Sequence, residues 1–136
     1  MSHLLEVAST LPDFGLYLLT AFLLLTTYSV IYTAVTPHPE WSLLRQGNLS
    51  AALAFGGSMV GFVLPLCSAI AHSVSIVDVA VWGLVAMVVQ ITAFFVLRLA
   101  IPTISKDIES DRPGPATAAA LFFLAIGLVN AACMTW

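Results

Sequence analysis

The sequence predicts an all-α membrane protein with four transmembrane helices, and three observations lead to that fold class. Of its 136 residues, 60% are hydrophobic and 8% are charged, and the mean hydropathy is +1.04. A soluble domain carries about 25% charged residues, and so small a fold could not bury this much apolar surface away from water. Polar segments divide the chain into four apolar stretches of about 20 residues, long enough to cross a hydrocarbon core of about 30 Å as helices. None of the stretches has the alternating pattern of a barrel strand.

The four predicted spans belong to one integral membrane domain, residues 1–136. They cover Phe14–Val35, Ala51–Ala71, Val79–Ile101 and Thr117–Thr135. The first follows Pro12-Asp13, and the third is expected to start at the capping-box pattern Ser75-Ile-Val-Asp78. Residues 14–70 also align weakly with residues 80–136, which suggests a direct repeat of two two-helix hairpins. Coincidence between helices of such restricted composition is the alternative interpretation.

The connections between the spans differ in character. Residues 39–47 begin with Pro and end with Gly, a pattern that indicates one short helix, expected to lie in the lipid headgroup region. Residues 105–115 are polar and contain two Pro and one Gly, so we expect a flexible connector there.

The positive charges predict the orientation in the membrane. All four, Arg45, Arg98, Lys106 and Arg112, lie in or beside the first and third loops. Basic loops stay in the cytoplasm, so both termini are expected to face outward, which in a bacterium means the periplasm. Four basic residues and a net charge of −3 offer no surface for nucleic acid, so no nucleic-acid partner is expected.

Three segments carry a resemblance to a known family. They are residues 36–41 (TPHPEW), residues 47–57 (GNLSAALAFGG, continuing through Gly61 to Pro65-Leu66) and residues 130–136 (NAACMTW). Together they resemble the YjfL-like family of bacterial inner-membrane proteins, also known as domain-of-unknown-function family 350. The resemblance covers nearly the whole chain. It implies a small inner-membrane protein without a known activity, in which a two-helix unit is duplicated. Genes of such proteins often lie beside those for a PspA-like envelope-stress protein and an ATP-grasp ligase, which points to envelope maintenance.

Small residues gather on one face of the second span. They are Ala54, Gly57, Gly61 and Ser68, with Pro65 beside them. Such a face lets another helix approach closely, so we expect helix packing there, including contact between copies in a homo-oligomer, most simply a dimer. A kink at Pro65 that lines a pathway is the alternative.

Three polar side chains lie within the predicted spans. Gln90 and Asn130 are expected to face other helices as hydrogen-bonding groups, with the lining of a conduit as the alternative. Arg98 is expected to extend to the headgroups, or to contact an anion or lipid phosphate.

Cys67 and Cys133, the two cysteines, are predicted at similar depth in their helices. Buried free thiols are the commonest outcome for this residue type. A disulfide in the oxidising compartment and soft-metal binding with Met134 or His72 are the alternatives. No metal or other cofactor is expected.

No catalytic motif is present in the sequence, so we expect a protein that is not an enzyme. Two classes of function remain. The first is a non-enzymatic membrane component that assembles with itself, or with an envelope-protein partner, in envelope maintenance or stress response. The second is a small oligomeric channel or transporter for an ion or small solute. Membrane lipid is a partner in both classes.

Overall fold

A computed structural model describes residues 1–134 of the chain. They form six helices and no strand: α1 (Ser2–Val35), α2 (Glu40–Arg45), α3 (Leu49–His72), α4 (Ile76–Ala100), α5 (Ile104–Glu109) and α6 (Pro113–Cys133). Four of these helices, α1, α3, α4 and α6, are long and apolar enough to cross a membrane, which confirms the predicted fold class. Thr135, the last residue of the predicted fourth span, lies outside the described part.

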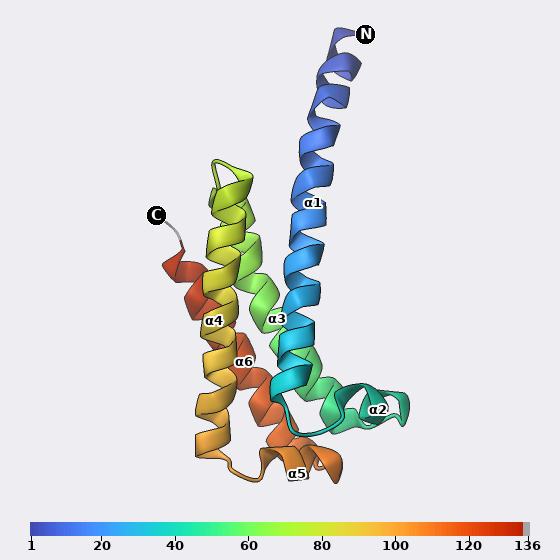
Figure 1. The fold of residues 1–136 in the computed structure, drawn as a ribbon, viewed down its shortest axis with the longest axis vertical. Helices are drawn as coiled ribbons and strands as arrows, with labels where there is room; N and C mark the ends of the chain where they lie inside the picture. The colour runs from blue at the N-terminus through green and yellow to red at the C-terminus, as the bar shows by residue number, and fades with distance from the viewer. Residues whose placement is uncertain (135–136) are drawn as a thin grey trace.

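The helices form an upright bundle in which each long helix runs opposite to the next (Figure 1). The short helices α2 and α5 both lie across one end, here called the α2/α5 end, and α6 runs from that end toward the side from which α1 starts. A long helix, a short helix and a second long helix therefore follow one another twice. That order agrees with a two-hairpin arrangement, whereas a repeat in the sequence itself stays a prediction.

The centre of the bundle is the crossing of α3 and α6, where the backbones come into direct contact. A Cβ atom added to Gly57 would lie 2.5 Å from the Ala120 Cα, and one added to Gly127 would overlap the Gly61 carbonyl. Only residues without side chains permit so close an approach. The buried Phe62 of α3 and Phe123 of α6 belong to the same core.

Helix α1 is longer than predicted, because it begins at Ser2 and continues through Pro12 without a break. The Pro12-Asp13 pair predicts a start, but Pro12 lies inside the helix, where it lacks the N–H that would donate to the Ala8 carbonyl. The N-terminal half of α1 extends past the other helices (Figure 1), and every residue from Ser2 to Leu16 is exposed.

The C-terminal half of α1 is held against α3 and α4. Tyr28 stacks on Phe62 of α3, with ring centroids 4.5 Å apart. The Leu24 side chain fills the space beside Gly83 of α4, where a Cβ would lie 2.7 Å from its Cδ1. One end of α1 is therefore built into the core, while the other has no neighbour within its own chain.

Residues 105–115 are not the flexible connector predicted from sequence. Residues 104–109 form α5, whose Ile104 and Ile108 are buried against the bundle. The Asn48 side chain caps α3 by accepting from the Ala51 N–H at 2.8 Å, and it donates to the Ile108 carbonyl at 2.8 Å. Ile104 and Ile108 lie on one face of this helix because they are four residues apart. Pro113 and Pro115 lie after α5, so they do not interrupt it.

The capping box before the third span is confirmed. Ser75 is the N-cap of α4, and its hydroxyl accepts from the Asp78 N–H at 3.4 Å. In return, the Asp78 carboxylate accepts from the Val74 N–H at 3.0 Å. The short helix predicted within residues 39–47 is present as α2, with Pro39 as its N-cap and Gly47 at a φ of 78° behind it.

Candidate functional site

The small-residue face of α3 is filled by α6 of the same chain. Ala54, Gly57, Gly61 and Pro65 are buried, and the Ser68 hydroxyl donates to the Ala131 carbonyl at 3.0 Å. The face therefore serves helix packing, as predicted. Within the chain, α6 occupies this groove at Gly57 and Gly61, and contact between copies through the same face stays a prediction.

Gln90 and Asn130 lie in different surroundings. Gln90 is fully buried, and its Nε2 donates to the Phe123 carbonyl at 3.1 Å across the α4–α6 contact, while its Oε1 has no partner. Asn130 is half-buried, and its Nδ2 has no hydrogen-bond partner. Gln90 contacts α6 at Phe123, and Asn130 lies seven residues further along α6, a rise of about 10 Å. The two side chains therefore do not form one polar site.

The remaining predicted residues lie on the outside of the bundle. Arg98 is exposed in the last turn of α4, at the α2/α5 end, where it can reach the headgroups. Cys67 and Cys133 are free and exposed, so the disulfide is absent and the expectation of buried thiols is wrong. Within residues 1–134, no three His, Cys, Asp or Glu side chains gather closely enough to hold a metal ion.

A buried tyrosine–serine contact, not predicted from sequence, joins α1 to α3. The Tyr28 hydroxyl is hydrogen-bonded to the Ser58 hydroxyl, and both side chains are fully buried. Tyr32, one turn further along α1, is also buried and packs edge-on against Phe94 of α4 at 5.8 Å. The spacing of four between two tyrosines was the available sequence signal, since it places both on one helix face.

A buried acid–base pair lies where α1 passes into α2. The His38 Nε2 lies 2.5 Å from the Glu40 Oε1, and neither side chain has any exposed surface. The other polar atom of each side chain, His38 Nδ1 and Glu40 Oε2, is buried without a hydrogen-bond partner. In the sequence, His38 and Glu40 belong to the polar segment at the start of the predicted short helix. Nothing in the sequence indicates that both side chains would be buried.

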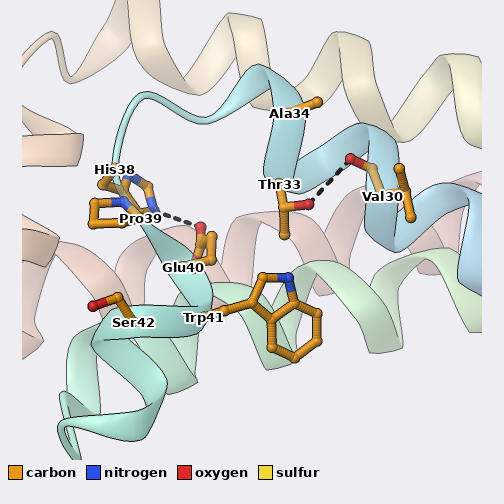
Figure 2. A pocket seen from close by; sticks show the side chains of 8 residues that line it. All are labelled: Val30, Thr33, Ala34, His38, Pro39, Glu40, Trp41 and Ser42. Carbon is orange, nitrogen blue, oxygen red and sulfur yellow. Dashed lines mark hydrogen bonds and ion pairs between the residues drawn. The ribbon is translucent and has the colours of Figure 1, made fainter.

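A pocket of about 410 Å³ adjoins this pair (Figure 2). Its lining residues come from the last turns of α1 and from the start of α2: Val30, Thr33, Ala34, His38, Pro39, Glu40, Trp41 and Ser42. Figure 2 shows the Glu40 carboxylate facing His38 on one side, with Thr33 and Trp41 on the other. The Trp41 side chain is 53% exposed. The pocket therefore combines a buried carboxylate with an accessible aromatic ring.

The loop after α5 clamps the start of α3 through an exposed carboxylate. The Asp111 Oδ1 accepts from both the N–H and the hydroxyl of Ser50, each at 2.9 Å. These two hydrogen bonds, the backbone one above all, stabilise the carboxylate and lower the pKa of Asp111 below its usual value of 3.8. Beside it, the Arg112 guanidinium donates to the Asp107 carboxylate at 3.0 Å. These contacts make the α2/α5 end an ordered cap.

Four long apolar helices, with short helices between the first pair and between the second pair, define the class of a small multi-pass membrane protein. The chain belongs to the family described as Domain of Unknown Function (DUF350), whose model matches residues 6–134. This confirms the family resemblance seen in the sequence.

The relatives support a place in the bacterial inner membrane. The UPF0719 inner membrane protein YjfL of Escherichia coli (strain K12) is 38% identical over 136 residues, covering 97% of this chain and all of that protein. The UPF0719 transmembrane protein YshE of Bacillus subtilis (strain 168) is 25% identical over 118 residues, covering 87% of this chain and 88% of that protein. No solved structure matches the chain.

Proposed function

We propose that the chain is a non-enzymatic component of the inner membrane that assembles with itself and serves envelope maintenance. The proposal includes an orientation with the α2/α5 end in the cytoplasm and the termini in the periplasm. Its support is that Arg45, Arg98, Lys106 and Arg112 all lie at the α2/α5 end, as expected for cytoplasmic segments.

The observation that carries self-assembly is an apolar stripe along α1. Its residues recur in the heptad pattern of a helix pair: Leu4, Val7, Leu11, Phe14, Leu18, Ala21, Leu25, Tyr28 and Tyr32. From Ala21 to Tyr32 the stripe packs against α3 and α4. From Leu4 to Leu18 it continues with the same period, but each of its side chains is exposed. Phe14 and Leu18 still lie near Ile70 of α3, whereas the seam before them, at Leu4, Val7 and Leu11, is exposed.

The length of α1 supports a position outside the hydrocarbon for the first part of the stripe, before Phe14. With 34 residues, α1 is roughly 51 Å long, compared with about 30 Å for the hydrocarbon core. The segment before Phe14 therefore reaches the headgroups or water, as Glu6 and Asp13 also require. Outside the hydrocarbon its exposed apolar side chains face water or headgroups, and a second helix packed on them would stabilise the segment.

A second copy of α1 can supply this helix. Two copies inserted in one orientation present identical stripes in parallel, and the heptad spacing allows the side chains to interdigitate. Glu6 and Asp13 lie seven residues apart, on a face away from the stripe, so like charges of the two copies do not meet.

The polar contacts inside the bundle favour a structural component over a channel. Gln90 binds the Phe123 carbonyl, Tyr28 binds Ser58, and Ser68 binds the Ala131 carbonyl. Each contact joins two helices, which is the usual use of polar side chains in membrane bundles.

Cross-linking tests the assembly. In a background with Cys67→Ser and Cys133→Ser, both exposed positions, we expect Leu11→Cys to form a disulfide-linked dimer in membranes. Ser9→Cys, two residues away but off the stripe, is the matched control and should form little. Equal cross-linking of the two variants, or a monomer mass for the intact complex in detergent, would overturn self-assembly through α1.

The envelope role needs a separate measurement. Deletion of the gene should raise the expression of an envelope-stress reporter, and the wild-type chain should return that expression to its original level. Leu11→Glu, which places like charges in the seam, should be present in the membrane but leave the reporter expression high. Ser9→Glu should return it to the original level. A reporter that does not respond to deletion would reject envelope maintenance and leave the assembly result standing.

A further inference from the structure

Glu40 has an unused hydrogen-bond acceptor in a buried position. His38 takes one carboxylate oxygen, Oε1, while Oε2 is buried and has no partner. Among residues 1–134, the ion pairs are His38–Glu40 and Asp107–Arg112, so no lysine or arginine neutralises Glu40. A buried carboxylate is costly unless its charge and lone pairs are satisfied. The site therefore lacks a hydrogen-bond donor for Oε2, and His38 serves Oε1 alone.

We propose that the pocket between α1 and α2 binds the primary ammonium headgroup of a membrane phospholipid. The Glu40 Oε2 accepts an N–H bond from the ammonium group, and the Trp41 ring lies against the cation. A carboxylate beside an aromatic face is a combination that recognises ammonium groups, because the ring supplies a negative face to the charge. Rotation of the half-exposed Trp41 side chain admits the headgroup to Oε2.

The position of the pocket selects a lipid rather than a soluble amine. It lies at the end of the α1 span, at the level where tryptophan side chains gather in membrane proteins. Val30, 62% exposed, and Ala34 form its α1 wall, and they continue onto the lipid-facing surface of that helix. An acyl chain can lie along this wall while the headgroup occupies the roughly 410 Å³ beside Glu40.

The chemistry of the pocket also selects among headgroups. A primary ammonium has three N–H donors, so it can serve the Glu40 Oε2 and the Thr33 hydroxyl oxygen together. A choline headgroup has the same charge but no N–H, and a glycerol headgroup has no positive charge. Binding should therefore follow the order phosphatidylethanolamine, then phosphatidylcholine, then phosphatidylglycerol.

Lipid binding to the purified full-length chain tests the proposal. Native mass spectrometry in detergent should show phosphatidylethanolamine bound at least tenfold more tightly than phosphatidylcholine, which binds more tightly than phosphatidylglycerol. Glu40→Gln should abolish the preference for phosphatidylethanolamine. Glu109→Gln, the same change at an exposed position of α5 at the same end, should keep it.

A second variant tests the site in case Glu40→Gln does not fold. Trp41→Leu leaves the His38–Glu40 pair untouched and should weaken phosphatidylethanolamine binding by several-fold, up to about tenfold. Equal binding of the ethanolamine and choline lipids, or unchanged preference in either variant, would overturn the site. Free ethanolamine should not compete at millimolar concentration, and full competition by it would overturn the assignment to a lipid.

Discussion

Replacing Gly127 by alanine tests the close crossing of α3 and α6, because the added methyl group has no space. Its Cβ would overlap the Gly61 carbonyl oxygen and would lie 2.8 Å from both the Gly61 carbonyl carbon and Cα. These are backbone atoms of α3, so no side chain can rotate away. The two helices must instead separate, by several tenths of an ångström at the least.

The Gly61 carbonyl is exposed to this contact for a reason visible in the sequence. Pro65 has no N–H, so it cannot donate to the carbonyl four residues earlier, as a helix interior otherwise requires. The small Gly127 backbone packs against the freed carbonyl. A Cα–H contact to a carbonyl oxygen is a weak attraction that recurs at helix–helix crossings.

The magnitude follows from two opposing contributions. Overpacking a tight core costs about 1–3 kcal/mol, and rigid backbone neighbours place Gly127→Ala near the upper limit. The gain in helix propensity from glycine to alanine offsets about 0.5–1 kcal/mol of this. We therefore expect a loss of roughly 2 kcal/mol in the free energy of unfolding.

Gly56→Ala is the matched control, since Gly56 lies on α3 beside Gly57 with nothing within 4 Å of its added Cβ. It should leave stability unchanged or raise it by up to about 1 kcal/mol. The assay is unfolding of the purified variants in mixed micelles, followed by helical circular dichroism as denaturing detergent is increased. Identical unfolding of the two variants would refute the close α3–α6 contact.

Three further predictions follow from the polar groups. Gln90→Leu should change the free energy of unfolding by about 1 kcal/mol or less, because it removes one hydrogen bond together with an unpartnered acceptor. If the wild-type chain conducts a solute in liposomes and the folded variant does not, that result would instead favour the channel function. Since folding lowers the pKa of Asp111, its carboxylate contributes stability above about pH 3.8 that is lost as the pH falls through the lowered pKa. Asp111→Asn should remove this acid-sensitive contribution from a thermal-melting profile in pH, and a profile identical to wild type would contradict the clamp on Ser50. Cysteine labelling should place Lys106 in the cytoplasm and Met1 in the periplasm, and the reverse pattern would reject the proposed orientation.

The spans were predictable because their signal is local. About 20 consecutive apolar residues identify a helix that crosses the membrane whatever its neighbours are. The ends were less predictable, since Pro12 resembles a start although the helix runs through it. The same limit applies to residues 104–109, where two buried isoleucines form a helix in a segment that reads as a connector.

The site residues show which information a sequence lacks. Small residues on α3 indicated close packing, but only the fold shows that α6 of the same chain packs on this face. Tyr28 and Ser58 are 30 residues apart, and their contact depends on how α1 leans on α3. His38 and Glu40 are near neighbours in sequence, yet their burial depends on the turn between α1 and α2. Tertiary packing determines these contacts and this burial, and no local sequence pattern encodes tertiary packing.

Both proposed interaction sites lie on α1, and the core explains why. The α3–α6 crossing leaves no room for a ligand, because backbone meets backbone at Gly57, Gly61 and Gly127. The C-terminal half of α1 joins that core, and Tyr28 binds there through hydrogen bonding and stacking. The N-terminal part of α1 carries the uncovered stripe, and its last turns border the Glu40 pocket. One continuous helix connects the two sites, so the distance between the partner seam and the headgroup site is set by the length of α1. Shortening or lengthening α1 between Leu18 and Tyr28 would therefore displace one site relative to the membrane while leaving the α3–α6 core intact.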